Sequence, residues 1–113
     1  MLKEAKKALR VTVAAYDTEI MDLLAAGAKD LEIAGVIVPG RVAYTMGTDD
    51  AVTDNSTLKD PLVKRAVITY AAMMFGNPPN HDKLKESYEI QKVQLMHADR
   101  YTDYGEADED AES

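Results

Sequence analysis

The sequence predicts an all-α protein, a small bundle of about four helices with a long middle loop or small β-hairpin between the second and third helices. Apolar residues recur every three or four positions in four separate segments, which is the spacing of one helix face. Residues 35–59 break this pattern, because they are turn-rich and far exceed a usual connection of about 4 to 6 residues. A chain of 113 residues fits one domain with a thin core.

The first two helices precede that middle segment. Leu2, Ala5 and Leu9 share one helical face, and lysines fill the other, so the first helix covers about residues 2–10. The second helix begins near Tyr16 or Asp17 and has one apolar stripe, formed by Ile20, Leu23, Leu24, Gly27, Ala28 and Leu31. A helical glycine costs about 1 kcal/mol relative to alanine, so Gly27 predicts a close helix neighbour or a locally weaker helix.

The third helix is predicted to begin at Asp60 and Pro61. An aspartate can cap free backbone amides, and a proline has no amide to leave unpaired at the first helical position. The helix is apolar nearly all round, which is typical of the centre of a bundle or of a contact between subunits. Met74 belongs to its predicted core stripe, and residues 76–80 end the helix.

The fourth predicted helix covers about residues 81–100 and has two apolar patches on nearly opposite sides. One patch contains Leu84, Tyr88 and Leu95, and the other contains Ile90 and Val93. Two patches call for two neighbours, and in so small a chain the second neighbour can be another subunit. Scattered surface apolar residues are an equal alternative.

The middle segment contains two β-prone runs, residues 36–38 and 41–44, on either side of Pro39 and Gly40. This dipeptide suits a tight turn, so a small hairpin is predicted around it. Long connections are usually either working surfaces or disordered.

Charge divides the chain into a helical domain, residues 1–101, and a flexible acidic tail, residues 102–113. Six acids and no base lie in the tail, so of the 20 acids 14 remain in the domain, against 13 bases. A nearly neutral domain has no face-wide basic surface, which disfavours tight binding of nucleic acid. The sequence lacks cysteine, a secretory signal and a membrane-spanning apolar run, and we expect a cytoplasmic protein without membrane contact.

No motif of catalysis, metal binding or cofactor binding is present, so we expect no enzyme and no cofactor. His81 and His97 lie too far apart for ligands on one helical face, and the aspartates of residues 49–54 lack the pattern of a calcium loop. The favoured interpretation of the basic residues Lys3, Lys6, Lys7 and Arg10 is a solvated helix face. If they instead contact phosphates, the alternative function is a small helical DNA-binding or regulatory protein that acts as a dimer.

Several motifs resemble one known family. They are residues 9–11, 16–20, 22–26 and 34–36 in the first half, and residues 60–70, 75–76, 87–88 and 101–104 in the second half. Over about residues 2–105 the chain resembles the head-tail connectors of long-tailed phages and prophages, also termed head completion, adaptor or DNA packaging proteins. None of these motifs is catalytic.

The resemblance implies a virion structural protein at the head-tail junction, made in the cytoplasm of the bacterial host. About twelve such subunits form a homo-oligomeric ring beneath the portal protein, extend the DNA channel and join the DNA-filled head to the tail. The implied partners are the portal protein, a stopper or tail-completion protein, and passing genomic DNA bound without sequence specificity.

Three sets of residues are predicted to make these contacts. The portal-binding segment is Tyr101, Thr102, Asp103, Tyr104 and Gly105. The subunit interface is Leu84, Tyr88, Ile90, Val93 and Leu95. Contact with a neighbour or the next ring is predicted for Val36, Ile37, Val38, Arg41, Val42 and Tyr44, with a simple solvent-exposed hairpin as the alternative.

Overall fold

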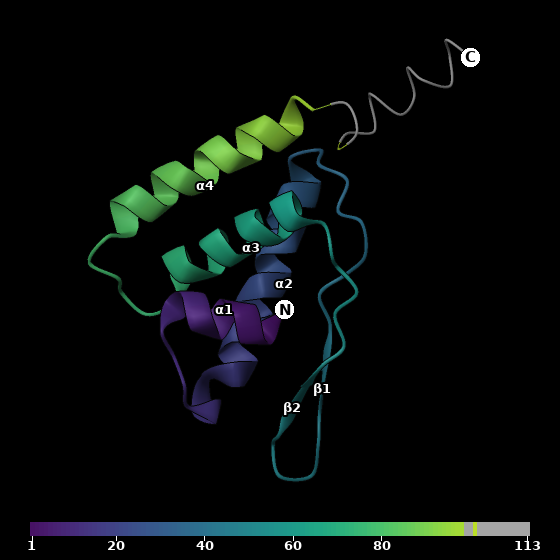
Figure 1. Ribbon diagram of the computed structural model, residues 1–113, viewed down its shortest axis with the longest axis vertical. Helices are drawn as coiled ribbons and strands as arrows, with labels where there is room; N and C mark the ends of the chain where they lie inside the picture. Colours follow the sequence, from purple (N-terminus) through teal and green to yellow (C-terminus); the bar gives the residue numbers. More distant parts are fainter. Residues whose placement is uncertain (99–100, 102–113) are drawn as a thin grey trace.

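The computed structural model describes residues 1–98 and residue 101. In chain order, the described elements are the α-helix α1 (Leu2–Leu9), the 3₁₀ turn η1 (Ala14–Tyr16), the α-helix α2 (Asp17–Ile33), the strands β1 (Tyr44–Met46) and β2 (Val52–Asp54), and the α-helices α3 (Pro61–Met74) and α4 (His81–Met96). Four α-helices with a small hairpin between α2 and α3 confirm the predicted fold class (Figure 1).

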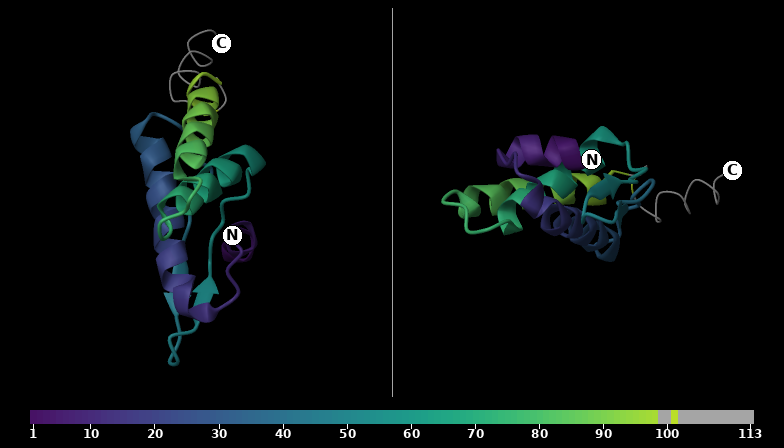
Figure 2. Two further views of the ribbon diagram at one scale, coloured as in Figure 1. Left: turned by 90° about the vertical axis from the view of Figure 1, so that its left-hand side faces the viewer. Right: turned by 90° about the horizontal axis from the view of Figure 1, so that it is seen from below.

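Helix α3 is the centre of the bundle, because it packs against each of the other three helices (Figures 1 and 2). This placement explains why it is apolar nearly all round. The chain between α2 and α3 runs along another side of the bundle from α4, and the hairpin tip extends past the helices. Helix α4 ends at Met96, before the predicted position near residue 100.

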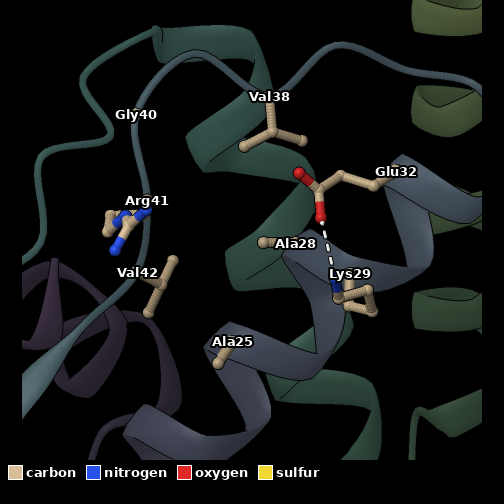
Figure 3. A pocket seen from close by; sticks show the side chains of 8 residues that line it. All are labelled: Ala25, Ala28, Lys29, Glu32, Val38, Gly40, Arg41 and Val42. Carbon is tan, nitrogen blue, oxygen red and sulfur yellow. Dashed lines mark ion pairs between the residues drawn. The ribbon is translucent and has the colours of Figure 1, made fainter.

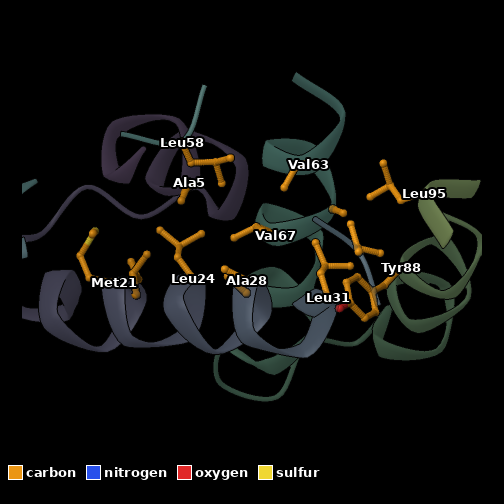
Figure 4. Close-up of a cluster of buried hydrophobic side chains, with 14 of the residues drawn as sticks. Ala5, Met21, Leu24, Ala28, Leu31, Leu58, Val63, Val67, Tyr88 and Leu95 are labelled. Carbon is orange, nitrogen blue, oxygen red and sulfur yellow. The ribbon is translucent and has the colours of Figure 1, made fainter. Parts of the chain in front are cut away.

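The core lies between the helices (Figure 4), and the chain between α2 and α3 contributes Val36 and Leu58 to it. Its buried members are Leu2, Ala5, Ile20, Met21, Leu24, Ala28, Leu31, Val36, Leu58, Val63, Ala66, Val67, Ala71, Tyr88, Leu95 and Tyr101. The prediction that Met74 is a core residue is wrong, since its side chain is 47% exposed. Met74 is the last residue of α3, where the helix gives way to the loop toward α4.

Gly27 lies where α2 and α3 approach closely, which confirms one of the two readings of this glycine. A Cβ added to Gly27 would lie 3.0 Å from Cδ1 of Tyr70 on α3. The Tyr70 ring in turn makes an edge contact with the Tyr88 ring on α4, with ring centroids 5.4 Å apart. The absence of a side chain at one position therefore lets three helices meet.

The start of α3 is capped as predicted. Oδ1 of Asp60 accepts hydrogen bonds from the backbone N–H groups of Leu62 (3.0 Å) and Val63 (3.1 Å), and Pro61 is the first helical residue. Both amides lack partners within the helix, so the cap supplies bonds that they would otherwise miss.

The hairpin lies further along the chain than predicted. Its strands pair antiparallel with Tyr44 opposite Asp54, and residues 47–51 form the turn. Gly40 does not reverse the chain. Its φ of +95° favours glycine, and an added Cβ would lie 2.7 Å from the carbonyl oxygen of Thr57. The dipeptide Pro39-Gly40 therefore bends the outgoing segment so that it can lie against the returning one.

Hydrogen bonds continue this ribbon toward the bundle beyond the two short strands. The carbonyl oxygen of Ala43 accepts from Asn55 N–H (2.8 Å), and the carbonyl oxygen of Arg41 accepts from Thr57 N–H (2.8 Å). The Thr57 hydroxyl also accepts from Arg41 N–H (3.0 Å). Residues 41–43 thus have a backbone fixed by the returning segment.

Candidate interaction surfaces

The inner face of α4 belongs to the core of the chain. Tyr88 is 2% exposed and Leu95 is 3% exposed, while Leu84 is half-buried. Both side chains pack within their own subunit and leave little surface for a neighbour, so the interface role of Tyr88 and Leu95 stays a prediction. Periodicity groups residues on one helix face, but it does not say which face meets the chain's own core.

The outer face of α4 holds the exposed residues of the predicted interface. Ile90 is 53% exposed and Val93 is 46% exposed. Glu86 lies one turn before Ile90 on the same face and is also exposed. We call Glu86, Ile90 and Val93 the outer stripe. It offers two branched apolar side chains and one carboxylate to a partner.

A polar cluster holds the inner face of α4 against α2. The Tyr88 hydroxyl donates a hydrogen bond of 2.5 Å to Oδ2 of Asp30, and Nζ of Lys92 lies 3.3 Å from the same oxygen. Burial, and then the hydrogen bond to the Asp30 carboxylate, raise the pKa of Tyr88 above its usual value. The cluster fixes the rotation of α4 about its axis and so keeps the outer stripe facing away from the core.

Tyr101 lies in the core of the described structure, although it was predicted to bind the portal. It is 7% exposed, and its hydroxyl donates to Oδ2 of Asp60 over 2.9 Å. Its carbonyl oxygen accepts from the Ile37 N–H over 2.6 Å. This side chain joins the end of the described structure to the start of α3, and the portal role of Tyr101 stays a prediction. Thr102, Asp103, Tyr104 and Gly105 lie outside the described residues.

The predicted contact residues of the middle segment divide between core and surface. Val36 is buried, whereas Ile37, Val38, Val42 and Tyr44 are half-buried and Arg41 is exposed. The Tyr44 hydroxyl donates to Oδ1 of Asp22 on α2 (2.8 Å). The segment therefore lies along α2 with one side, and only its other side is accessible.

A pocket of about 210 Å³ opens between α2 and this segment (Figure 3). Ala25, Ala28, Lys29 and Glu32 line it from α2, and Val38, Gly40, Arg41 and Val42 line it from the segment. We call it the loop pocket. Its walls are mainly small and branched apolar side chains. Lys29 and Glu32 form an ion pair of 3.4 Å at one rim, and Arg41 lies at the opposite rim.

A third contact region joins α1 to β2. Oδ2 of Asp54 accepts from the Leu2 N–H (2.7 Å) and lies 2.9 Å from the amino group of Met1. Burial alone would raise the pKa of Asp54, but these bonds and those from Ser56 hold it below its ordinary value. The region anchors the hairpin to the bundle.

Among the described residues, no group of acidic residues, histidines or cysteines has the arrangement of a metal site.

With this geometry in view, comparison with known proteins identifies the family. A family model described as "Phage connector protein" matches residues 1–102. The chain belongs to the phage connector family. The match spans the whole described bundle, the hairpin and Tyr101, and it supports a structural role as a phage connector. No curated protein and no solved structure is a significant match. Over the described part of this connector, no helix is both long and apolar enough to cross a membrane.

Sequence reasoning missed the part of the loop pocket that comes from α2. Ala25, Lys29 and Glu32 lie outside the apolar stripe of that helix and were not singled out. The small side chains of residues 25–28 were the available signal, because a helix with such a face leaves room for a neighbouring chain to approach. That the neighbour is the segment around Val38 and Val42 follows only from the tertiary structure.

Proposed function

We propose that this protein is the head-tail connector subunit of a long-tailed phage, and that about twelve copies form a ring beneath the portal. In the virion the ring extends the DNA channel and joins the DNA-filled head to the tail. Membership of the phage connector family carries this proposal. The two exposed surfaces described above support the ring.

A closed ring requires two different surfaces on each subunit, because every copy contacts one neighbour with each. This chain offers the outer stripe on α4 and the loop pocket beside α2. Helix α4 and the middle segment lie on different sides of the bundle (Figure 1). One neighbour can therefore occupy each surface without displacing the other.

The portal contact is proposed for residues 102–105, with Tyr104 as its aromatic anchor. Tyrosine buries a large area with few rotatable bonds, which suits an anchor in a protein interface. Tyr101, which directly precedes this peptide in the sequence, is hydrogen-bonded to Asp60 at the start of α3. The exposed side of the middle segment, including Arg41, is then available to a neighbour, the next ring, or the stopper or tail-completion protein.

The charge of the domain suits a channel through which DNA must move. The domain, residues 1–101, carries 14 acids and 13 bases, once the six acids of the tail are set aside from the total of 20. Affinity for the phosphate backbone grows with the number of cations that contact it. A nearly neutral wall therefore lets genomic DNA pass without sequence-specific binding.

Native mass spectrometry over a concentration series tests the proposal, first with the chain alone and then with purified portal rings. We expect an assembly near twelve subunits, either alone or on the portal. A chain that stays monomeric and does not bind portal rings would overturn the proposal. A stable dimer that shifts a DNA probe in a salt-dependent way would instead support the regulatory alternative.

A further inference from the structure

We propose that the outer stripe of one copy binds in the loop pocket of the next copy, with Glu86 paired to Arg41 across the contact. The inference rests on the proposed ring and names the two surfaces that would build it. It makes α4 the inserting element and the middle segment the receiving one.

The loop pocket is large enough for an aliphatic side chain of the outer stripe. An apolar cavity of about 150 Å³ accommodates a benzene ring, so a pocket of about 210 Å³ has room for a branched aliphatic side chain such as that of Ile90. Ala25, Ala28, Val38 and Val42 would surround it. Insertion would remove from water both the exposed stripe and the exposed pocket walls, which favours association.

The charged parts of the two surfaces are complementary. The Arg41 guanidinium is exposed and forms no ion pair with any described residue. Glu86 is likewise exposed and has no described ion-pair partner. An arginine can bind a carboxylate through two parallel hydrogen bonds, which fixes orientation as well as adding attraction. The second copy is therefore the occupant that supplies both the apolar side chains and the missing carboxylate.

Hydrogen bonds within the single subunit position both surfaces. The hydrogen bond from Tyr88 to Asp30 positions the part of α4 that carries the outer stripe. The hydrogen bonds between Arg41 and Thr57 position the wall of the loop pocket. The contact is heterologous, since the stripe and the pocket are different surfaces. After one contact forms, each subunit at the end of the assembly keeps one surface open, and repetition can close a ring.

Charge reversal tests the pairing. Arg41→Glu and Glu86→Arg are each expected to raise the concentration needed for half-assembly at least tenfold, and the double variant is expected to recover most of the loss. Matched controls are Arg65→Glu and Glu19→Arg, which make the same charge changes at exposed positions outside both surfaces. Circular dichroism checks that each variant folds. A double variant no better than the singles would overturn the pairing.

Cysteine cross-linking tests the contact without relying on its strength. The chain contains no cysteine, so each engineered thiol stands alone. A mixture of the Val93→Cys and Ala25→Cys variants is expected to give a covalent dimer on oxidation, whereas Val93→Cys mixed with Arg65→Cys should not. If the unmodified chain assembles but the first mixture stays uncross-linked, this contact is wrong and the connector function stands. If the unmodified chain assembles neither alone nor on portal rings, the proposed function itself fails.

Discussion

Asp60 shows how much one side chain can determine in a domain of this size. Its Oδ1 accepts from the Leu62 and Val63 amides, and its Oδ2 accepts from the Tyr101 hydroxyl. The first two hydrogen bonds cap the N-terminus of the central helix, and the third attaches Tyr101 to it. Residues that are 41 positions apart in sequence are therefore joined through one carboxylate.

Asp60→Ala is expected to lower the free energy of unfolding by about 1–3 kcal/mol, because it removes the helix cap and a hydrogen bond to a charged group. Thermal melting followed by circular dichroism measures the loss. Tyr101→Phe serves as the matched control, since it removes the hydroxyl and leaves the cap in place. Its melting temperature should fall between those of the unmodified chain and Asp60→Ala. Equal melting for Asp60→Ala and the unmodified chain would contradict the role given to this carboxylate.

At the scale of single residues, the sequence correctly predicted the features that depend mainly on the residue type at one position. Asp60 and Pro61 marked the start of α3, and Gly27 marked a close helix approach. Tyr88 was predicted at a subunit interface from the two apolar patches of its helix, whereas the portal role of Tyr101 followed from the family resemblance. The deciding facts are the carboxylates of Asp30 and Asp60, which come from distant parts of the sequence.

At the scale of elements, the middle segment is the part that sequence reasoning placed least well. A hairpin was predicted about Pro39 and Gly40, but the turn lies at residues 47–51. Both stretches contain turn-forming residues, so turn chemistry alone could not choose between them. The choice depends on Val36 and Leu58, which are both buried and hold the two ends of the segment at the bundle.

Gly40→Ala is expected to destabilise the wall of the loop pocket, because the new Cβ would meet the Thr57 carbonyl in a backbone conformation that alanine rarely adopts. Gly35→Ala is the matched control. Its φ of +96° is almost the same, but nothing lies within 4 Å of an added Cβ. We expect about 1 kcal/mol of destabilisation from the backbone strain common to both, and a larger loss for Gly40→Ala.

Denaturant unfolding measures both losses, and amide hydrogen exchange at Arg41 and Thr57 reports the ribbon directly. Exchange at these amides should accelerate in Gly40→Ala and stay unchanged in Gly35→Ala. Equal unfolding free energies for the two variants would mean that the close approach of Gly40 to Thr57 does not contribute to stability.

On the scale of the whole molecule, the helical bundle was predictable because α3 carries its own evidence. A helix that is apolar on nearly every side must be surrounded, and α1, α2 and α4 surround it. It was less predictable which side chains of α4 face the core, since this depends on the orientation of α4 about its own axis relative to α2 and α3. In the observed orientation Tyr88 and Leu95 are buried, and Ile90 and Val93 are exposed.

Truncation tests where the folded domain ends. Removal of residues 106–113 is expected to leave the melting temperature unchanged, because this acidic segment has only two alanines to offer to a core. Removal of residues 99–113 also deletes Tyr101 and should cost about 3–5 kcal/mol, as for the loss of a buried aromatic side chain. Equal melting of the two truncated chains would contradict the core position of Tyr101.

In the proposed ring, the hydrogen bond between Asp30 and Tyr88 has a consequence for the kinetics of association. Because this bond and the fastening of Tyr101 hold α4 at two places, the outer stripe enters an encounter already ordered. A preordered surface loses little conformational entropy on association. Fewer collisions therefore fail because the surface must first rearrange. Loosening α4 from within, as in Tyr88→Phe, would then slow association although the altered atom lies on the far side of the helix from the partner.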